Sequence, residues 1–191
     1  GNTFNQQTGT SAASFNLNGR TLTMDGAGYT LLTRINNNAL HTTGTIIKNG
    51  SGRVVNAGGF NGTITQVQLN QGTFELSSNW SAAKVTATAG FDFTGNATMQ
   101  LSGATTDLSS KIKIEDGVTA TIDTTGSTTI ASYATAFQVG ALGTGAFTKT
   151  GANTLTLSGT NTYTGGTTVN HGTLVLDGPT GATGTIRGTL D

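Results

Sequence analysis

Two short alternating segments that lie about one coil apart, each after a glycine, constrain the fold of this chain more than any other feature. Residues 154–157 read TLTL and follow Gly151, and residues 173–176 read TLVL and follow Gly172, which lies 21 residues after Gly151. A unit of this size cannot bury its apolar face alone, so it must stack on similar units. The spacing therefore predicts a solenoid of β-strands.

Similar alternation continues through the rest of the chain, with apolar residues at every second position. We expect strands at residues 20–24, 44–48, 53–55, 63–69, 73–76, 98–101, 111–114, 118–122, 154–157, 167–169 and 173–176. Glycines precede many of these segments, and Gly52, Gly72, Gly95 and Gly117 are separated by 20, 23 and 22 residues. Residues 82–89 are the least strand-like piece of the chain.

An interval of 20–23 residues suits one coil of a three-sided parallel β-helix. The interval from Gly117 to Gly151 is 34 residues, which predicts an insertion or irregular rung between Gly126 and Gly145. We expect an all-β chain that forms a single elongated domain of about nine coils. The residues expected to face inward are Leu22, Ile46, Ile64, Phe74, Leu76, Met99, Leu101, Ile112, Ile114, Ile122, Leu155, Leu157, Leu174 and Leu176.

An antiparallel sandwich is the alternative fold. Asn-Gly dipeptides stand at residues 18–19, 49–50 and 61–62, and this dipeptide is the strongest short-range signal for a hairpin. The likeness between segments one coil apart favours the solenoid. Thr-x-Thr segments such as residues 63–65 and 119–121 resemble ice-binding faces, but unequal coil lengths argue against a regular plane.

Composition narrows the class of protein. Charged residues make up 9% of the chain and the formal net charge is zero, so nothing suggests a nucleic-acid partner. Disordered chains combine low hydrophobicity with high net charge, whereas this chain is 34% hydrophobic and has one proline. It has no cysteine, and no apolar run approaches the roughly 18 residues of a transmembrane helix.

The segment 147–176 resembles a known family. It reads FTKTGANTLTLSGTNTYTGGTTVNHGTLVL, and nothing common to β-proteins requires its NTYTGGT core. It closely resembles the autotransporter-associated β-strand repeat, also called the passenger-associated transport repeat. The matching positions expected to be structural are Gly151, Thr154, Leu155, Leu157, Gly159, Asn161, Tyr163, Gly165, Gly166, Val169, Gly172 and Leu174.

This resemblance implies a right-handed β-helix in the passenger region of a large bacterial surface protein. It also implies a partner, an outer-membrane β-barrel of the same parent, through which the passenger is exported C-terminal part first. We divide the chain into degenerate coils at residues 1–146, repeat coils at 147–178 and a glycine-rich tail at 179–191. A regular coil near the C-terminus would fold outside the cell and serve as a template for the next coil.

Few residues could support catalysis. We expect His41 and His171 to be loop or turn residues, and we expect no catalytic, cofactor-binding or metal-binding residue. The carboxylate cluster Glu115-Asp116, with Asp123 nearby and Lys111 and Lys113 on one strand face, resembles the patches of carbohydrate-active enzymes on β-helices. Its simpler interpretation is a solvated strand end and turn. The aspartate-rich nonapeptide that binds calcium in other solenoids is missing.

Two aromatic side chains also have alternative interpretations. Trp80 could stack on a sugar, cap an end of the rod or pack under a loop, whereas Tyr163 belongs to the repeat and is expected to be structural. Neither residue is sufficient to define a binding site.

The favoured function is a non-catalytic shaft or adhesive passenger, located extracellularly on the bacterial surface. Its partner would be a host-cell or glycan surface, contacted through loops at residues 33–44, 77–94 and 126–145. The first alternative is a structural subunit that self-associates end to end through its end coils. The second is a carbohydrate-active enzyme on the same fold.

Overall fold

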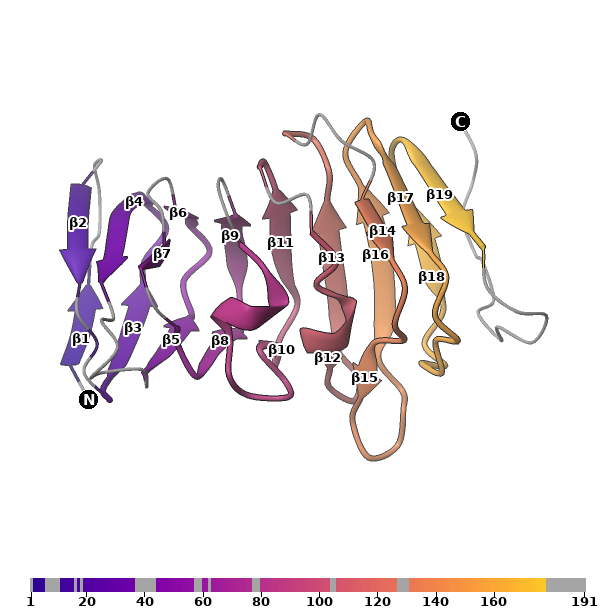
Figure 1. Cartoon of the computed structure of the whole chain (residues 1–191), viewed down its shortest axis with the longest axis horizontal. Coiled ribbons are helices and arrows are strands. Elements are labelled where there is room, and N and C mark those ends of the chain that lie inside the picture. The colour runs from indigo at the N-terminus through magenta and orange to yellow at the C-terminus, as the bar shows by residue number, and fades with distance from the viewer. Residues whose placement is uncertain are drawn as a thin grey trace.

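The chain folds as a rod of parallel strands. The computed structural model describes residues 2–5, 11–15, 17, 19–36, 44–56, 60–61, 63–76, 80–103, 106–126 and 131–177. Successive rungs stand side by side along the long axis, from the indigo N-terminal strands to the yellow C-terminal ones (Figure 1). Within those residues, no helix has the length and apolar character needed to cross a membrane.

Three sheets form the sides of the rod, and every strand pairing is parallel. The first sheet contains β1 (Asn2–Asn5), β3 (Thr21–Asp25), β5 (Thr45–Lys48), β8 (Gln66–Leu69), β10 (Phe91–Phe93), β12 (Ile112–Ile114) and β15 (Gln138–Val139). The second contains β2 (Ser11–Phe15), β4 (Tyr29–Asn36), β6 (Arg53–Asn56), β9 (Gly72–Leu76), β11 (Ala97–Leu101), β13 (Thr119–Asp123), β16 (Ala146–Thr150) and β18 (Thr167–Val169), with β7 (Phe60–Asn61) beside β4. The third contains β14 (Ala131–Tyr133), β17 (Thr154–Leu157) and β19 (Thr173–Leu176).

This topology confirms the parallel β-solenoid and rules out the antiparallel sandwich. In the first sheet the spatial order of strands is their order in the chain, so each coil adds one rung. The first sheet has seven strands and the path through the second has eight, so the described coils number fewer than the nine expected. Asn49-Gly50 joins β5 of the first sheet to β6 of the second, and is a corner rather than a hairpin.

The core consists of files of side chains that stack from rung to rung. One file runs through Leu22, Ile46, Val67, Phe91 and Ile112, which are all buried. Of the residues expected to face inward, all are buried except two in β19. Leu174 is half-buried, and Leu176 is 45% exposed because the described part of the chain places no further strand against β19.

Several predicted strands differ from the observed ones. Residues 63–65 are not in a strand, although Ile64 makes an isolated parallel bridge to Val85. Residues 82–89, which were expected to be the least strand-like piece of the chain, contain the 3-10 turn η1 (Ala82–Lys84). A second 3-10 turn, η2 (Ser109–Lys111), contains Lys111, so the expectation that one strand face carries both Lys111 and Lys113 is wrong.

The predicted insertion or irregular rung between Gly126 and Gly145 corresponds to the longest strand-to-strand spacing in the second sheet, but the 34-residue interval from Gly117 to Gly151 does not measure one coil. Gly117 precedes a strand of the second sheet, whereas Gly151 follows one, so the interval joins two different corners. Equivalent residues in β13 and β16 are Thr119 and Ala146, 27 positions apart. The segment expected to be irregular contains β14 and β15.

From β9 to β18, unequal coil lengths leave the strands of the second sheet in register, whereas the β2–β4 pairing shifts register between Ala13 and Ser14. Five threonines on consecutive strands form one outward file, namely Thr73, Thr98, Thr121, Thr148 and Thr168. The segments between strands therefore accommodate the differences in coil length. This differs from the expectation that unequal coils would prevent a regular plane of threonines. The neighbouring file contains Glu75, Gln100 and Asp123, so the face as a whole is chemically mixed.

Candidate functional site

The repeat segment forms two stacked coils at the C-terminal end of the described rod. Strand β16 pairs with β18 in the second sheet, and β17 pairs with β19 in the third. Leu155 lies opposite Leu174, and Leu157 lies opposite Leu176. Both leucines of β17 are buried, so the first coil of the repeat presents a closed apolar interior to the second.

Glycines allow the corners of the two coils to approach closely. Gly151 has φ +83° and Gly172 has φ +73°, in the left-handed region that glycine adopts at little cost. A Cβ atom on Gly159 would lie 2.2 Å from the backbone nitrogen of Ala136, and one on Gly165 would lie 2.7 Å from the carbonyl oxygen of Gly145. The glycines of the repeat therefore permit backbone contact between successive coils.

Asn161 and Tyr163 close the side of the repeat that has no regular strand. The Asn161 side chain accepts a hydrogen bond from the Phe137 backbone N–H at 2.8 Å, one coil earlier. The buried Tyr163 hydroxyl lies 2.7 Å from the Thr167 hydroxyl, and its ring stacks on Phe137 with centroids 6.5 Å apart. Both side chains connect coils, which agrees with the structural role expected for Tyr163.

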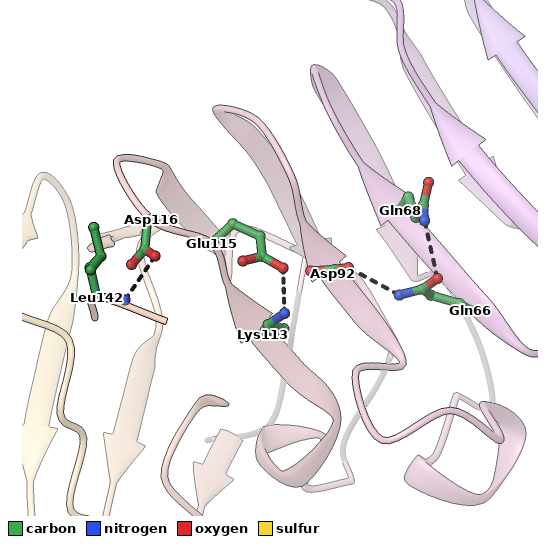
Figure 2. Close-up of polar contacts among 7 residues, drawn as sticks. All are labelled: Gln66, Gln68, Asp92, Lys113, Glu115, Asp116 and Leu142. Atoms are coloured by element: carbon green, nitrogen blue, oxygen red, sulfur yellow. Dashed lines mark hydrogen bonds and ion pairs between the residues drawn. The ribbon is translucent and has the colours of Figure 1, made fainter. Parts of the chain in front are cut away.

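A row of polar side chains crosses three strands on the outer face of the first sheet (Figure 2). Gln68 donates to Gln66 at 3.2 Å, and Gln66 donates to the Asp92 carboxylate at 3.1 Å. On the next rung, Lys113 forms an ion pair with Glu115. Asp92 was not among the candidate residues of the sequence analysis, although its position between Phe91 and Phe93 in an alternating segment indicated an outward side chain.

Asp92 has the most perturbed carboxylate of this row. Burial, reinforced by the negative charge of Glu115, raises its pKa, while Lys113 and the Gln66 hydrogen bond oppose the shift. Its side chain is nearly enclosed, and its Oδ1 atom has no hydrogen-bond partner among the described residues. The enclosed carboxyl group is therefore not presented to a ligand in solution.

The predicted carboxylate cluster does not converge. Asp116 accepts a backbone hydrogen bond from Leu142 at 2.9 Å (Figure 2) and another from Thr144 at 3.0 Å. These bonds lower the pKa of Asp116. Asp123 lies at the far end of β13, about 16 Å along the strand from the corner that holds Asp116. Asp123 accepts from the backbone and side chain of Thr125 instead. Glycoside hydrolysis requires two carboxyl groups that flank one bond, whereas Asp116 precedes β13 and Asp123 is the last residue of that strand.

The remaining residues considered for binding or catalysis are Trp80, His171 and His41. Trp80 is 1% exposed and packs against Phe74 and Phe91, with ring centroids 6.0 and 5.4 Å away, so the sugar-stacking alternative is wrong. His171 is an exposed turn residue, as expected. His41 and the tail at 179–191 lie outside the described residues.

A shallow groove of about 350 Å³ lies on the second sheet, lined by Asn96, Ala97, Thr98, Thr119 and Thr121. It contains no titratable side chain, so its lining offers hydroxyl and amide groups but no general acid or base. Among the described residues, no three His, Cys, Asp or Glu side chains are grouped to hold a metal ion.

Comparison with protein families identifies the repeat. Residues 147–176 match the family model described as Passenger-associated-transport-repeat, which covers the two coils built from β16 to β19. This chain therefore carries a passenger-associated transport repeat, which forms the last described coils of a parallel β-solenoid. No curated protein and no solved structure matches the chain.

Proposed function

We propose that this chain is a non-catalytic segment of the passenger of a bacterial autotransporter, exported through the outer-membrane barrel of its parent protein and displayed on the cell surface. In this role the solenoid is a shaft, and the repeat promotes folding during export. The observation that carries the proposal is that the matched residues coincide with two stacked coils rather than with a loop or a pocket.

The repeat coils supply a template of defined shape. Strand β17 buries Leu155 and Leu157 while its backbone pairs with β14 on one side and β19 on the other. Each leucine that becomes buried stabilises the growing rod by about 1.5–3 kcal/mol. Because every coil contacts only its neighbours, folding can propagate from one formed coil to the next. Outside the membrane, this propagation would oppose backsliding of the chain.

The geometry of the polar groups favours a non-catalytic role. Glu115 is paired with Lys113, and Asp116 is held by backbone N–H groups of residues 142 and 144. Turnover of a polyuronide that is abolished by Glu115→Gln or Asp116→Asn would contradict this part of the proposal.

Adhesion would depend on the segments between strands. The loop at residues 140–144 contains Leu142, which is 77% exposed. Asp116 holds this loop from the preceding rung, and Thr164 donates its backbone N–H to the Gly143 carbonyl at 2.8 Å from the following one. A glycan array and a cell-binding assay, each with and without this loop, test whether it contacts a host or glycan surface.

The export role is tested in the full-length parent protein with Leu155→Asp plus Leu174→Asp. These charges would enter the interior between the two repeat coils, so surface display should slow at least several-fold in a pulse-chase assay. The matched control is Thr156→Asp plus Val175→Asp, on the opposite face of the same strands. Equal display kinetics for the two double variants would reject the proposal.

A further inference from the structure

Two lysines occupy positions in the apolar core. In the second sheet, Lys149 follows Phe74, Met99 and Ile122 in one inward file. In the first sheet, Lys48 lies between Met24 and Leu69. Lys149 is 0% exposed and Lys48 is 1% exposed. A buried ammonium group is costly unless its N–H donors are satisfied, so each lysine requires a set of acceptors.

The acceptors of Lys149 come from two successive corners. Its Nζ atom donates to the carbonyl oxygens of Thr150 at 2.8 Å and Gly151 at 2.7 Å, in its own corner. It also donates to the carbonyl of His171 at 3.0 Å, in the corner one coil later. An ammonium group has three donors, and here all three are used.

Lys48 repeats this arrangement about one hundred residues earlier and at a different corner. Its Nζ atom donates to the Gly50 carbonyl, two residues after it, and to the Gln71 carbonyl at 3.1 Å, one coil later. The residue after Gln71 is Gly72, with φ +75°, just as Gly172 with φ +73° follows His171. A Cβ atom on Gly72 would lie 2.7 Å from the Lys48 Nζ atom, so the glycine leaves room for the amine.

We propose that these two lysines are corner latches, and that Lys149 fastens the second coil of the repeat onto the first. In sequence, each latch consists of a lysine at an inward-facing strand position and a glycine two residues later. A second glycine, with positive φ, follows one coil further along the chain. The latch deepens the proposed function, because it assigns the docking of the templated coil to one side chain. The side chain of His171 has no part in it, since only its backbone carbonyl is used.

The test uses residue-resolved hydrogen exchange of the 191-residue chain. Two amides report docking of the second coil: Asn170 N–H bonds the Lys149 carbonyl at 2.9 Å, and Asp177 N–H bonds the Leu157 carbonyl at 3.0 Å. Ala146 N–H, which bonds the Val118 carbonyl at 2.8 Å, reports the preceding coil. In Lys149→Met, exchange at the two reporters should accelerate at least ~10-fold, which corresponds to about 1.4 kcal/mol, while Ala146 changes less than ~2-fold.

Two matched variants serve as controls. Lys113→Met removes a partly exposed lysine and should leave all three amides unchanged. His171→Gln should do the same because Gln71 occupies the equivalent position beside Lys48. No acceleration in Lys149→Met, or equal acceleration at all three amides, would overturn the latch. Either result leaves the export role to be decided by the leucine variants, so the two proposals fail independently.

A chemical rescue keeps the test decisive if Lys149→Met unfolds. Lys149→Ala removes the side chain beyond Cβ, which is three carbon atoms and an ammonium group. Propylammonium has these same atoms and could fill the space they leave. Added propylammonium chloride should restore folding or reporter protection, whereas 1-propanol and sodium chloride at the same concentration should not. Equal effects of all three additives would contradict a specific ammonium site.

Discussion

The corner glycine Gly172 lies directly against Gly151: a Cβ atom on Gly172 would be 2.2 Å from the Gly151 carbonyl oxygen. The two residues belong to successive coils, so this contact sets how closely the coils of the repeat approach. It explains why the repeat places glycine at position 172, and a Cβ atom on Gly151 would in turn lie 2.4 Å from the Thr125 backbone nitrogen of the preceding coil.

Gly172→Ala should destabilise the protein through two effects, the left-handed backbone and the steric clash. Gly117 is a matched control, because it has φ +70° but a Cβ atom added there would meet open space to a distance of 4 Å. Gly117→Ala should cost about 1–2 kcal/mol from backbone strain alone. Gly172→Ala should cost at least ~1 kcal/mol more. Urea denaturation measures both, and equal losses would show that close coil contact does not matter.

Stability should rise with pH on the alkaline side of neutrality. Burial lowers the pKa of Lys48 and of Lys149 from 10.5 to about 8, opposed by the nearby charges of Asp25 and Asp123 respectively. Between these values the unfolded chain binds more protons than the folded one, so unfolding becomes less favourable as pH increases. The neutral amine still carries two N–H donors for the corner carbonyls.

The measurement is the urea midpoint at pH 7.5 and pH 9.5 for the wild type and for Lys48→Met plus Lys149→Met. The upper limit lies below 10.0, the ordinary tyrosine pKa, and burial raises the pKa of Tyr133 and of Tyr163 above that value. The midpoint should increase in the wild type and remain flat in the double variant. A similar increase in both would assign the pH dependence to other groups.

Asp92 should have the opposite effect on the acid side. Because its pKa is raised from 3.8, the folded protein retains a proton that the unfolded chain has lost, and stability falls as pH rises through that window. Asp92→Asn should therefore be at least as stable as the wild type at pH 7 and should lose this pH dependence.

Asp116→Asn provides the contrasting variant. Backbone hydrogen bonds lower the Asp116 pKa, so its stabilisation is present above 3.8 and is lost as pH falls through the lowered value. The melting temperature is measured at pH 4 and pH 7 for both variants and the wild type. Relative to the wild type, the change in melting temperature from pH 4 to pH 7 should be more positive in Asp92→Asn and less positive in Asp116→Asn. Destabilisation by both substitutions at pH 7 would show that the enclosed Asp92 carboxylate is favourable.

Tyr163→Phe should destabilise the repeat coil modestly. The substitution keeps the ring that stacks on Phe137 and removes only the hydroxyl that bonds Thr167. Loss of one such hydrogen bond typically costs about 0.5–1.5 kcal/mol, because the buried Thr167 hydroxyl is left without this partner. Tyr163→Ala should cost about 3–5 kcal/mol through the lost ring. A chemical denaturation series compares the two variants, and equal losses would contradict a packing role for the ring.

Alternation and glycine spacing predicted the solenoid because both are local features of the chain. Leu155, Ile112 and Met99 were placed inward correctly, since period-2 alternation fixes the face on which a strand residue lies. Corner identity was not predictable in the same way. Gly117 and Gly151 look alike in sequence, and only strand pairing reveals that they belong to different corners.

The burial of Lys149 and of Trp80 could not be predicted from local sequence pattern. Lys149 alternates with Phe147 and is thus on the inward phase, but lysine is usually exposed. One of the carbonyls that accept its hydrogen bonds belongs to His171, 22 residues later in the chain. Trp80 showed no alternation that would place it, and its aromatic neighbours come from two different strands. Contacts of this kind depend on tertiary packing rather than on local pattern.

In the proposed function, the repeat coils fold first and act as a template for the rest of the rod. Pulse-labelling hydrogen exchange during refolding of the whole chain tests this claim most directly, because it reports when each amide becomes protected. Ser158 and Asn170, whose N–H groups bond the carbonyls of Tyr133 and Lys149, should gain protection before Thr45 and Thr73 in the N-terminal coils. Earlier protection of Thr45 and Thr73 would contradict the claim.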